Sequence, residues 1–401
     1  MDFALGSTIE LLGVAMLVAI VARRLRLPYT VGLVLAGLGL ALTRVDFGVT
    51  LTHDVIFDVI LPALLFEAAL SIRWSELKRD LAPVLALSTL GVALGAATVA
   101  AGLKFLLGWP IGPALAFGAL IAATDPIAVI ALLRESGVKG RLKLVIESES
   151  LLNDGVAALL FSLVLGAFYG AGDPPTALDV AAQALLIAGG GAAIGAVGAG
   201  LAIIVAGRTQ DYLVETALTT VAAYGTFLIA ERVGASGVLA TVTAGLMMGN
   251  LGVLADDARP FALSPHGRVF VVAFWQFAAF VANSLVFLLI GLAMAATPAH
   301  AFAALAEIVA LALAGRAATV YPVALLFARS RWAIPWPQRH FLWWSGLRGA
   351  LALALALSLS PSAPYRDEIV VAAFAVVAFS VLVQGLAAKP ALRLLKLDRG
   401  G

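Results

Sequence analysis

Long apolar runs separated by short polar intervals recur from one end of this 401-residue chain to the other. Most runs approach the ~20 residues that an α-helix needs to cross the hydrocarbon core of a bilayer. The alternation of apolar and polar positions that is typical of membrane β-barrels does not occur. The pattern predicts an all-α polytopic membrane protein with about 13 transmembrane helices, at residues 7–24, 28–44, 54–72, 82–106, 112–133, 143–169, 178–206, 213–231, 235–252, 269–296, 301–327, 338–360 and 367–394.

The helix boundaries near residues 28, 235 and 252 are weak, so twelve or fourteen spans are also possible. The distribution of positive charge tests the count. Of the 26 Lys and Arg residues, twenty fall in alternate segments between the predicted helices, whereas three fall in the opposite set. Basic residues concentrate on the cytoplasmic side of a membrane protein. This split favours an odd number of spans. It predicts that the N-terminus lies outside and the C-terminus in the cytoplasm. The membrane is expected to be the plasma (inner) membrane of the cell.

Composition narrows the class of protein further. Hydrophobic residues make up 62% of the chain and charged residues 12%, against about 25% charged residues in soluble domains. The longest polar interval, residues 253–268, is too short to fold alone, so residues 1–401 are interpreted as one membrane transport domain without a soluble regulatory domain. There is no cysteine, the four histidines are scattered, and no G-x-x-x-x-G-K-[ST] phosphate loop is present. We therefore expect a transporter rather than an enzyme, with no cofactor and no nucleic-acid partner.

Two apolar runs contain an aspartate, which is costly in hydrocarbon and therefore indicates a functional site. Asp125 and Asp154 lie roughly 20 Å and roughly 17 Å into antiparallel predicted helices, at 1.5 Å per residue, so both reach the middle of the membrane. Pro126 lacks an N–H group and disfavours helix at Asp125. A break here would free backbone carbonyls, including that of Thr124, and such broken helices coordinate cations in secondary transporters. The pattern predicts a site for a small cation or a proton.

The helix that contains Asp154 offers two polar faces. Ser150 and Asp154 share one face, whereas Glu149 and Asn153 share another. Oxygen ligands suit hard cations. A buried hydrogen-bond network that only locks helices together is the alternative interpretation, and it is favoured for Glu149 and Asn153. Arg348, between Gly346 and Gly349, is the expected partner of Glu149.

Other polar residues within the predicted helices have less specific interpretations. Glu67 could guide ions toward the site, although a structural or interfacial role is also open. We expect Arg316 to pair with backbone or an acid, and Glu215 to be solvated near a helix end.

Five segments together resemble the monovalent cation:proton antiporter family, in its NhaP-type sodium/proton exchanger branch. They are Pro62-Ala63-Leu64-Leu65-Phe66-Glu67, Ala123-Thr124-Asp125-Pro126, Glu149-Ser150-Leu151-Leu152-Asn153-Asp154-Gly155, Asn283-Ser284-Leu285-Val286-Phe287-Leu288-Leu289-Ile290-Gly291 and Gly346-Leu347-Arg348-Gly349-Ala350. The resemblance implies a homodimer of the antiporter fold, in which two inverted repeats place unwound helices 5 and 12 across each other. It assigns residues 1–72 and 178–296 to dimerisation and scaffold helices, and 82–169 and 301–395 to an ion-carrying core.

The resemblance also assigns roles to individual residues. It makes Asp154 the main carrier of Na⁺ and H⁺, with Asp125, Ser150 and the Thr124 carbonyl completing the cation shell and a Glu149–Arg348 pair in support. Asn153 in place of a second aspartate is similar to the electroneutral branch. The sequence therefore predicts exchange of Na⁺ (or Li⁺) for H⁺ by alternating access, with a role in pH homeostasis. K⁺/H⁺ exchange and a passive cation channel are the alternatives, and an intramembrane hydrolase is disfavoured.

Overall fold

The computed structural model describes residues 5–25, 27–42, 52–138, 140–169, 176–255, 263–294 and 302–398, and these residues contain helices and no strand. The ends of the spans predicted at 28–44, 269–296 and 301–327 lie outside the described residues. The helices are α1 (Leu5–Leu25), α2 (Tyr29–Leu42), α3 (Leu61–Ser71), α4 (Trp74–Leu77), α5 (Leu81–Ala86), α6 (Val92–Leu107), α7 (Ile111–Ala122), α8 (Ile127–Glu135), α9 (Arg141–Tyr169), α10 (Ala177–Ala206), α11 (Tyr212–Arg232), α12 (Gly237–Met248), α13 (Pro265–Met294), α14 (Phe302–Leu326), α15 (Trp336–Trp344), α16 (Ala350–Leu357), α17 (Arg366–Phe379) and α18 (Gly385–Leu394).

Several of these helices join into longer rods through π-helical turns. Such turns lead into α3 (Val55–Ile60), connect α5 to α6 (Leu87–Gly91), extend α12 (Gly249–Val253) and connect α17 to α18 (Ser380–Gln384). Within the described residues, eight helical rods are long and apolar enough to cross a membrane, and three apolar helices are shorter. The all-α membrane architecture is confirmed, whereas the count of thirteen spans stays a prediction.

Two helical rods are broken in the middle rather than continuous. Residues 123–126 separate α7 from α8, and residues 345–349 separate α15 from α16. The first break contains Pro126, which cannot donate to a helical carbonyl, and the second contains Gly346 and Gly349. The two breaks touch, because the Asp125 N–H group donates to the Leu347 carbonyl at 2.7 Å. A Cβ atom on Gly349 would collide with the Asp125 side chain, so glycine permits this close approach.

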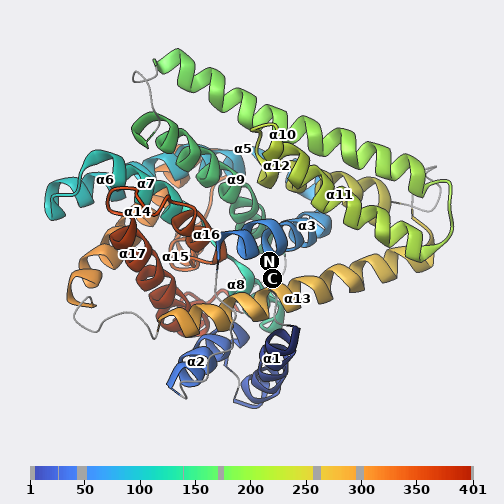
Figure 1. Cartoon of the computed structure of the whole chain (residues 1–401), viewed down its shortest axis with the longest axis horizontal. Coiled ribbons are helices and arrows are strands. Elements are labelled where there is room, and N and C mark those ends of the chain that lie inside the picture. The colour runs from blue at the N-terminus through green and yellow to red at the C-terminus, as the bar shows by residue number, and fades with distance from the viewer. Residues whose placement is uncertain are drawn as a thin grey trace.

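The helices gather into groups around these breaks (Figure 1). The long helix α10 lies with α11 and α12 on one side, whereas α6, α7, α14 and α17 lie on another, and α13 runs along the molecule. Small residues allow the tight contacts that membrane helices need. Gly191 and Gly195 of α10 abut the backbone of Ser236 and Ala240. The glycine-rich stretch of α10 is therefore a packing surface against α12.

Candidate ion-binding site

The break between α7 and α8 is held by side chains from α9. Asn153 is fully buried; its Nδ2 atom donates to the Thr124 hydroxyl at 2.7 Å, and its Oδ1 atom accepts from the Thr124 N–H group at 3.2 Å. Ser150 donates to the Thr124 carbonyl, the oxygen that the sequence predicts as a cation ligand. These bonds satisfy backbone groups that the break removes from helical pairing, which is the condition for irregular backbone at membrane depth.

Asp125 and Asp154 line one cavity beside this break, with a volume of about 590 Å³. The Asp125 Oδ1 atom accepts from the Ile127 N–H group at 3.0 Å, so the carboxylate caps the start of α8. Within the described residues, the buried Oδ1 atom of Asp154 has no hydrogen-bond partner. An unsatisfied carboxylate oxygen next to a cavity is open to a proton or a cation, because a buried polar atom without a partner is costly. The structure thus brings Thr124, Asp125, Ser150 and Asp154 together.

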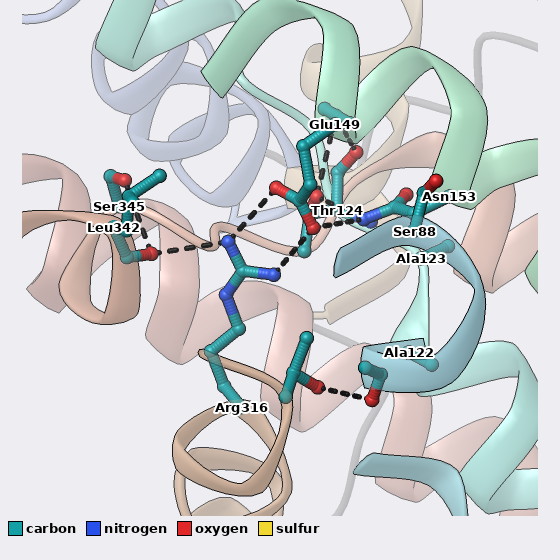
Figure 2. A network of polar contacts seen from close by, with 12 residues as sticks. Ser88, Ala122, Ala123, Thr124, Glu149, Asn153, Arg316, Leu342 and Ser345 are labelled. Carbon is teal, nitrogen blue, oxygen red and sulfur yellow. Dashed lines mark hydrogen bonds and ion pairs between the residues drawn. The ribbon is translucent and has the colours of Figure 1, made fainter. Parts of the chain in front are cut away.

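The partner of Glu149 differs from the prediction (Figure 2). Arg316 of α14 forms a two-pronged ion pair with Glu149, with its Nη atoms 2.7 Å and 3.0 Å from the two carboxylate oxygens. Both side chains are buried, and the guanidinium also donates to the Leu342 carbonyl at 3.1 Å. A Cβ atom on Gly346 would collide with Arg316, so this glycine leaves the space that the arginine occupies. The expectation that Arg316 pairs with backbone or an acid is correct on both counts.

Arg348 has a different role from the predicted ion pair with Glu149, and that pairing was wrong. Its Nη1 atom donates to the carbonyls of Ala122 and Ala123, at 2.9 Å and 3.0 Å. These carbonyls belong to the last residue of α7 and the first residue of the break, where a continuous helix would have supplied N–H partners. Arg348 therefore bridges the two breaks from the second to the first. Arg348 thus donates to backbone carbonyls, whereas Arg316 pairs with the Glu149 carboxylate.

Glu215 is also placed differently from the expectation of a solvated helix end. Its exposed fraction is 1%, and its carboxylate accepts from the N–H group and the hydroxyl of Ser264, at 3.0 Å and 2.9 Å. The carboxylate thus connects the start of α11 to the residue before α13. The sequence offers no signal for this contact, because Ser264 lies 49 residues away in a polar segment.

Glu67 lies where an ion-path residue would have to lie. It comes from α3 and lines the same cavity as Asp154, as do Arg134 of α8 and Glu147 of α9. Sequence reasoning gave Glu147 no role. The spacing of 147, 150 and 154 along α9 is the signal that could have singled it out, since these three positions fall on one face.

A bundle of apolar helices in which two broken members cross beside buried carboxylates has the architecture of a secondary ion transporter. Residues 12–394 match the family described as sodium/hydrogen exchanger, transmembrane. The chain is 40% identical over 393 residues to the Na(+)/H(+) antiporter ApNhaP of Aphanothece halophytica, covering 96% of this chain and 73% of that protein. It is 38% identical over 365 residues to the Na(+)/H(+) antiporter NhaP of Pseudomonas aeruginosa, covering 87% and 82%. The chain belongs to the sodium/hydrogen exchanger family.

The fold agrees with this assignment. The solved structure of the sodium proton antiporter MjNhaP1 from Methanocaldococcus jannaschii at pH 8 superposes with a TM-score of 0.77, at 21% identity, over 98% of each chain. The antiporter fold predicted from the sequence is therefore confirmed, and the chain is a multi-pass membrane protein of a transporter family.

Proposed function

We propose that this chain exchanges Na⁺ or Li⁺ for H⁺, with Asp154 as the group that carries either ion. The observation that carries the proposal is the buried Asp154 Oδ1 atom without a hydrogen-bond partner, beside a cavity that Asp125 and Ser150 also line. A carboxylate holds a cation when ionised and a proton when neutral, so the two ions compete for one group. Na(+)/H(+) antiport is also the activity in the names of the relatives ApNhaP and NhaP. Because Glu149, a buried acid on the same helix as Asp154, is held by Arg316, it does not compete for the ion.

The exchange is proposed to occur by alternating access, with residues 82–169 and 301–395 moving against scaffold residues 1–72 and 178–296 of a homodimer. The pattern of hydrogen bonds supports this division. In the described part of the chain, two side-chain hydrogen bonds join the two sets: His53 to the Ala354 carbonyl at 3.0 Å, and Ser71 to Glu147 at 3.5 Å. The ion pair of Arg316 and the bonds of Arg348 lie within the proposed core. Few polar contacts would therefore break when one set slides past the other.

We propose that the protein lies in the plasma membrane with its C-terminus in the cytoplasm, because Lys and Arg concentrate in the segments on that side. The cavity reaches Arg134 and Glu147, close to the predicted cytoplasmic segment between α8 and α9. We therefore propose that the site faces the cytoplasm.

The direct test of the activity uses purified protein in liposomes with an acidic lumen and a lumenal pH dye. Addition of Na⁺ or Li⁺ is expected to dissipate the pH gradient, and a zero-potential clamp with K⁺ and valinomycin is expected to leave the rate unchanged, because one Na⁺ enters for each H⁺ that leaves. Liposomes without protein are the control. Activity with K⁺ alone supports K⁺/H⁺ exchange, for which the same carboxylate chemistry would serve. Cation flux without proton movement indicates a channel.

The sidedness of the cavity can be tested by thiol labelling, because the chain contains no cysteine. Ala131 lines the cavity, whereas Ser360 is exposed in the segment after α16 that is predicted to lie outside. A membrane-impermeant maleimide is expected to label Ala131→Cys in everted vesicles and Ser360→Cys in right-side-out vesicles. Labelling of Ala131→Cys only from the outside would reverse the proposed orientation or the open side.

A further inference from the structure

The side chain of Gln384 is bonded to the edge of the second break, between α15 and α16. This glutamine ends the π-helical turn Ser380–Gln384 that joins α17 to α18, and its exposed fraction is 2%. Its Nε2 atom donates to the Trp344 carbonyl at 3.0 Å, and its Oε1 atom accepts from the Ser380 hydroxyl at 2.9 Å. Since a backbone carbonyl can only accept, the contact with Trp344 fixes the orientation of the amide. Both ends of the buried amide are therefore paired.

The carbonyl that Gln384 holds belongs to the segment that contacts Asp125. Trp344 is the last residue of α15, where the carbonyls of a helix lose their N–H partners. A few residues further on, the Leu347 carbonyl accepts from the Asp125 N–H group at 2.7 Å. The short segment between these two carbonyls is thus tied to Gln384 at one end and to Asp125 at the other. A shift of the Trp344 carbonyl would therefore be passed on to the backbone of Asp125.

The sequence around Gln384 resembles the sequence around the proposed carrier. Segments 150–155 and 380–385 each have serine first, leucine third and glycine last. In each segment a side chain donates to a backbone carbonyl at one of the breaks: Ser150 at the first and Gln384 at the second. The fifth position differs, because it is Asp154 in one segment and Gln384 in the other. A neutral amide with both ends paired therefore stands where the corresponding segment has a carboxylate.

The surroundings of Gln384 suit a neutral side chain. The helix α2 packs against the turn Ser380–Gln384, and neither element contains an acidic or basic residue. The first charged residue along α18 is Lys389, at its fifth position. A buried charge without a partner is costly. An amide can donate to a carbonyl at every pH, whereas an ionised carboxylate cannot donate at all.

We infer that Gln384 is a positioning residue for the exchange, because its amide holds the Trp344 carbonyl and thereby keeps the backbone of Asp125 in place. The inference rests on the proposed function. Gln384 does not line the ion cavity, so it acts through the second break on the first rather than on the ion itself. Its neutrality leaves the exchange of cation for proton to the carboxylates beside the first break.

The test measures the half-saturating Na⁺ concentration of Gln384→Met and Gln384→Glu in liposomes over a range of pH. Gln384→Met has no donor, so this concentration is expected to rise by about 3- to 10-fold at every pH. Protonated Gln384→Glu can donate to the Trp344 carbonyl, whereas its ionised form repels that oxygen. The ratio of its half-saturating concentration to that of the parent should therefore rise from below about 2 near about pH 6 to about 10 near about pH 9. Gln210 is exposed and outside the ion cavity, so Gln210→Met and Gln210→Glu are the matched controls and should behave as the parent.

A second measurement does not depend on transport. Folded Gln384→Glu pairs with the Trp344 carbonyl only when it is protonated, so its unfolding temperature relative to the parent should fall as pH rises. If the parent does not exchange cations for protons, the proposed function fails, and this measurement still reports whether the contact exists.

If the parent exchanges and folded Gln384→Met keeps the half-saturating concentration of the parent, the positioning role is wrong. Equal impairment of Gln384→Met and Gln384→Glu at every pH would also overturn it, because the side chain would then act by its shape alone. Parent behaviour of Gln384→Glu at every pH, beside impaired Gln384→Met, supports the role, because a protonated acid still donates. Should Gln384→Met fail to fold, Ser380→Ala takes its place, since it leaves the amide oxygen unpaired; about a 2-fold rise is expected, and no change overturns the inference.

Discussion

Replacing Asp154 with asparagine is expected to reduce Na⁺-driven proton movement by about 100-fold or more while the protein still folds. Asparagine keeps the volume of the side chain but can neither release a proton nor balance the charge of a cation. Since Asp154 Oδ1 has no hydrogen-bond partner within the described residues, its replacement breaks few contacts of the fold. The measurement is the initial rate of pH-gradient dissipation in liposomes, with thermal unfolding of the same preparation to show that stability is kept.

The matched control is Asp54→Asn, because this aspartate is exposed and does not line the cavity. It should exchange at the parent rate. Substantial Na⁺/H⁺ exchange by folded Asp154→Asn would remove Asp154 from the carrier role and leave Asp125, which lies beside the same break, as the remaining candidate.

The second large effect concerns stability. Arg316→Met is expected to lower the free energy of unfolding by about 3–5 kcal/mol, because it leaves the Glu149 carboxylate buried without its counter-charge. Adding Glu149→Gln to this variant should recover most of the loss, since the uncompensated charge is then gone. The measurement is a double-mutant cycle of thermal or denaturant stability in detergent. The cycle isolates the coupling between the two side chains from their other contacts.

The same cycle with Arg348→Met tests the alternative partner. Arg348 donates to the Ala122 and Ala123 carbonyls, so its loss should destabilise the broken segment but show a smaller coupling to Glu149 than Arg316 does. Equal or larger coupling between Glu149 and Arg348 would return the ion pair to the arginine that the sequence alone suggests.

Arg316 and Arg348 illustrate which features of the site can be predicted from the sequence and which cannot. The break in the first rod follows from Pro126 and the second from Gly346 and Gly349, because backbone chemistry acts locally. The convergence of Asp125 and Asp154 follows from antiparallel neighbours of known rise. The choice between Arg316 and Arg348 depends instead on which helix packs against Glu149, and both arginines are buried. No local pattern distinguishes them.

Glu215 illustrates the same limit at a helix end. Its position near the start of α11 is typical of a solvated acid, and only the return of the chain at Ser264 buries it. The positions of Thr124 and Ser150 were easier to predict, because Thr124 lies in the break and the spacing of Ser150 and Asp154 fixes a shared face. Contacts between residues close in sequence, or set by helical period, were thus accessible, and contacts that depend on long-range packing were not.

Polar contacts are strong within the proposed core and weak between the core and the scaffold, and this difference bears on the rate of the proposed exchange. The groups that define the site are cross-linked by a buried ion pair and a set of short hydrogen bonds, so they would travel as one stiff block. The proposed scaffold is tied to that block by the bonds of His53 and Ser71, and one such hydrogen bond contributes only about 1 kcal/mol net, or about 1.5–3 kcal/mol to a charged group. In the proposed mechanism, few polar contacts at the boundary and many within the block would let the block move without loss of the geometry of the site. The residues that would recognise the ion are thus held rigidly, whereas the boundary that would move has few polar contacts to break and would add little to the barrier to turnover.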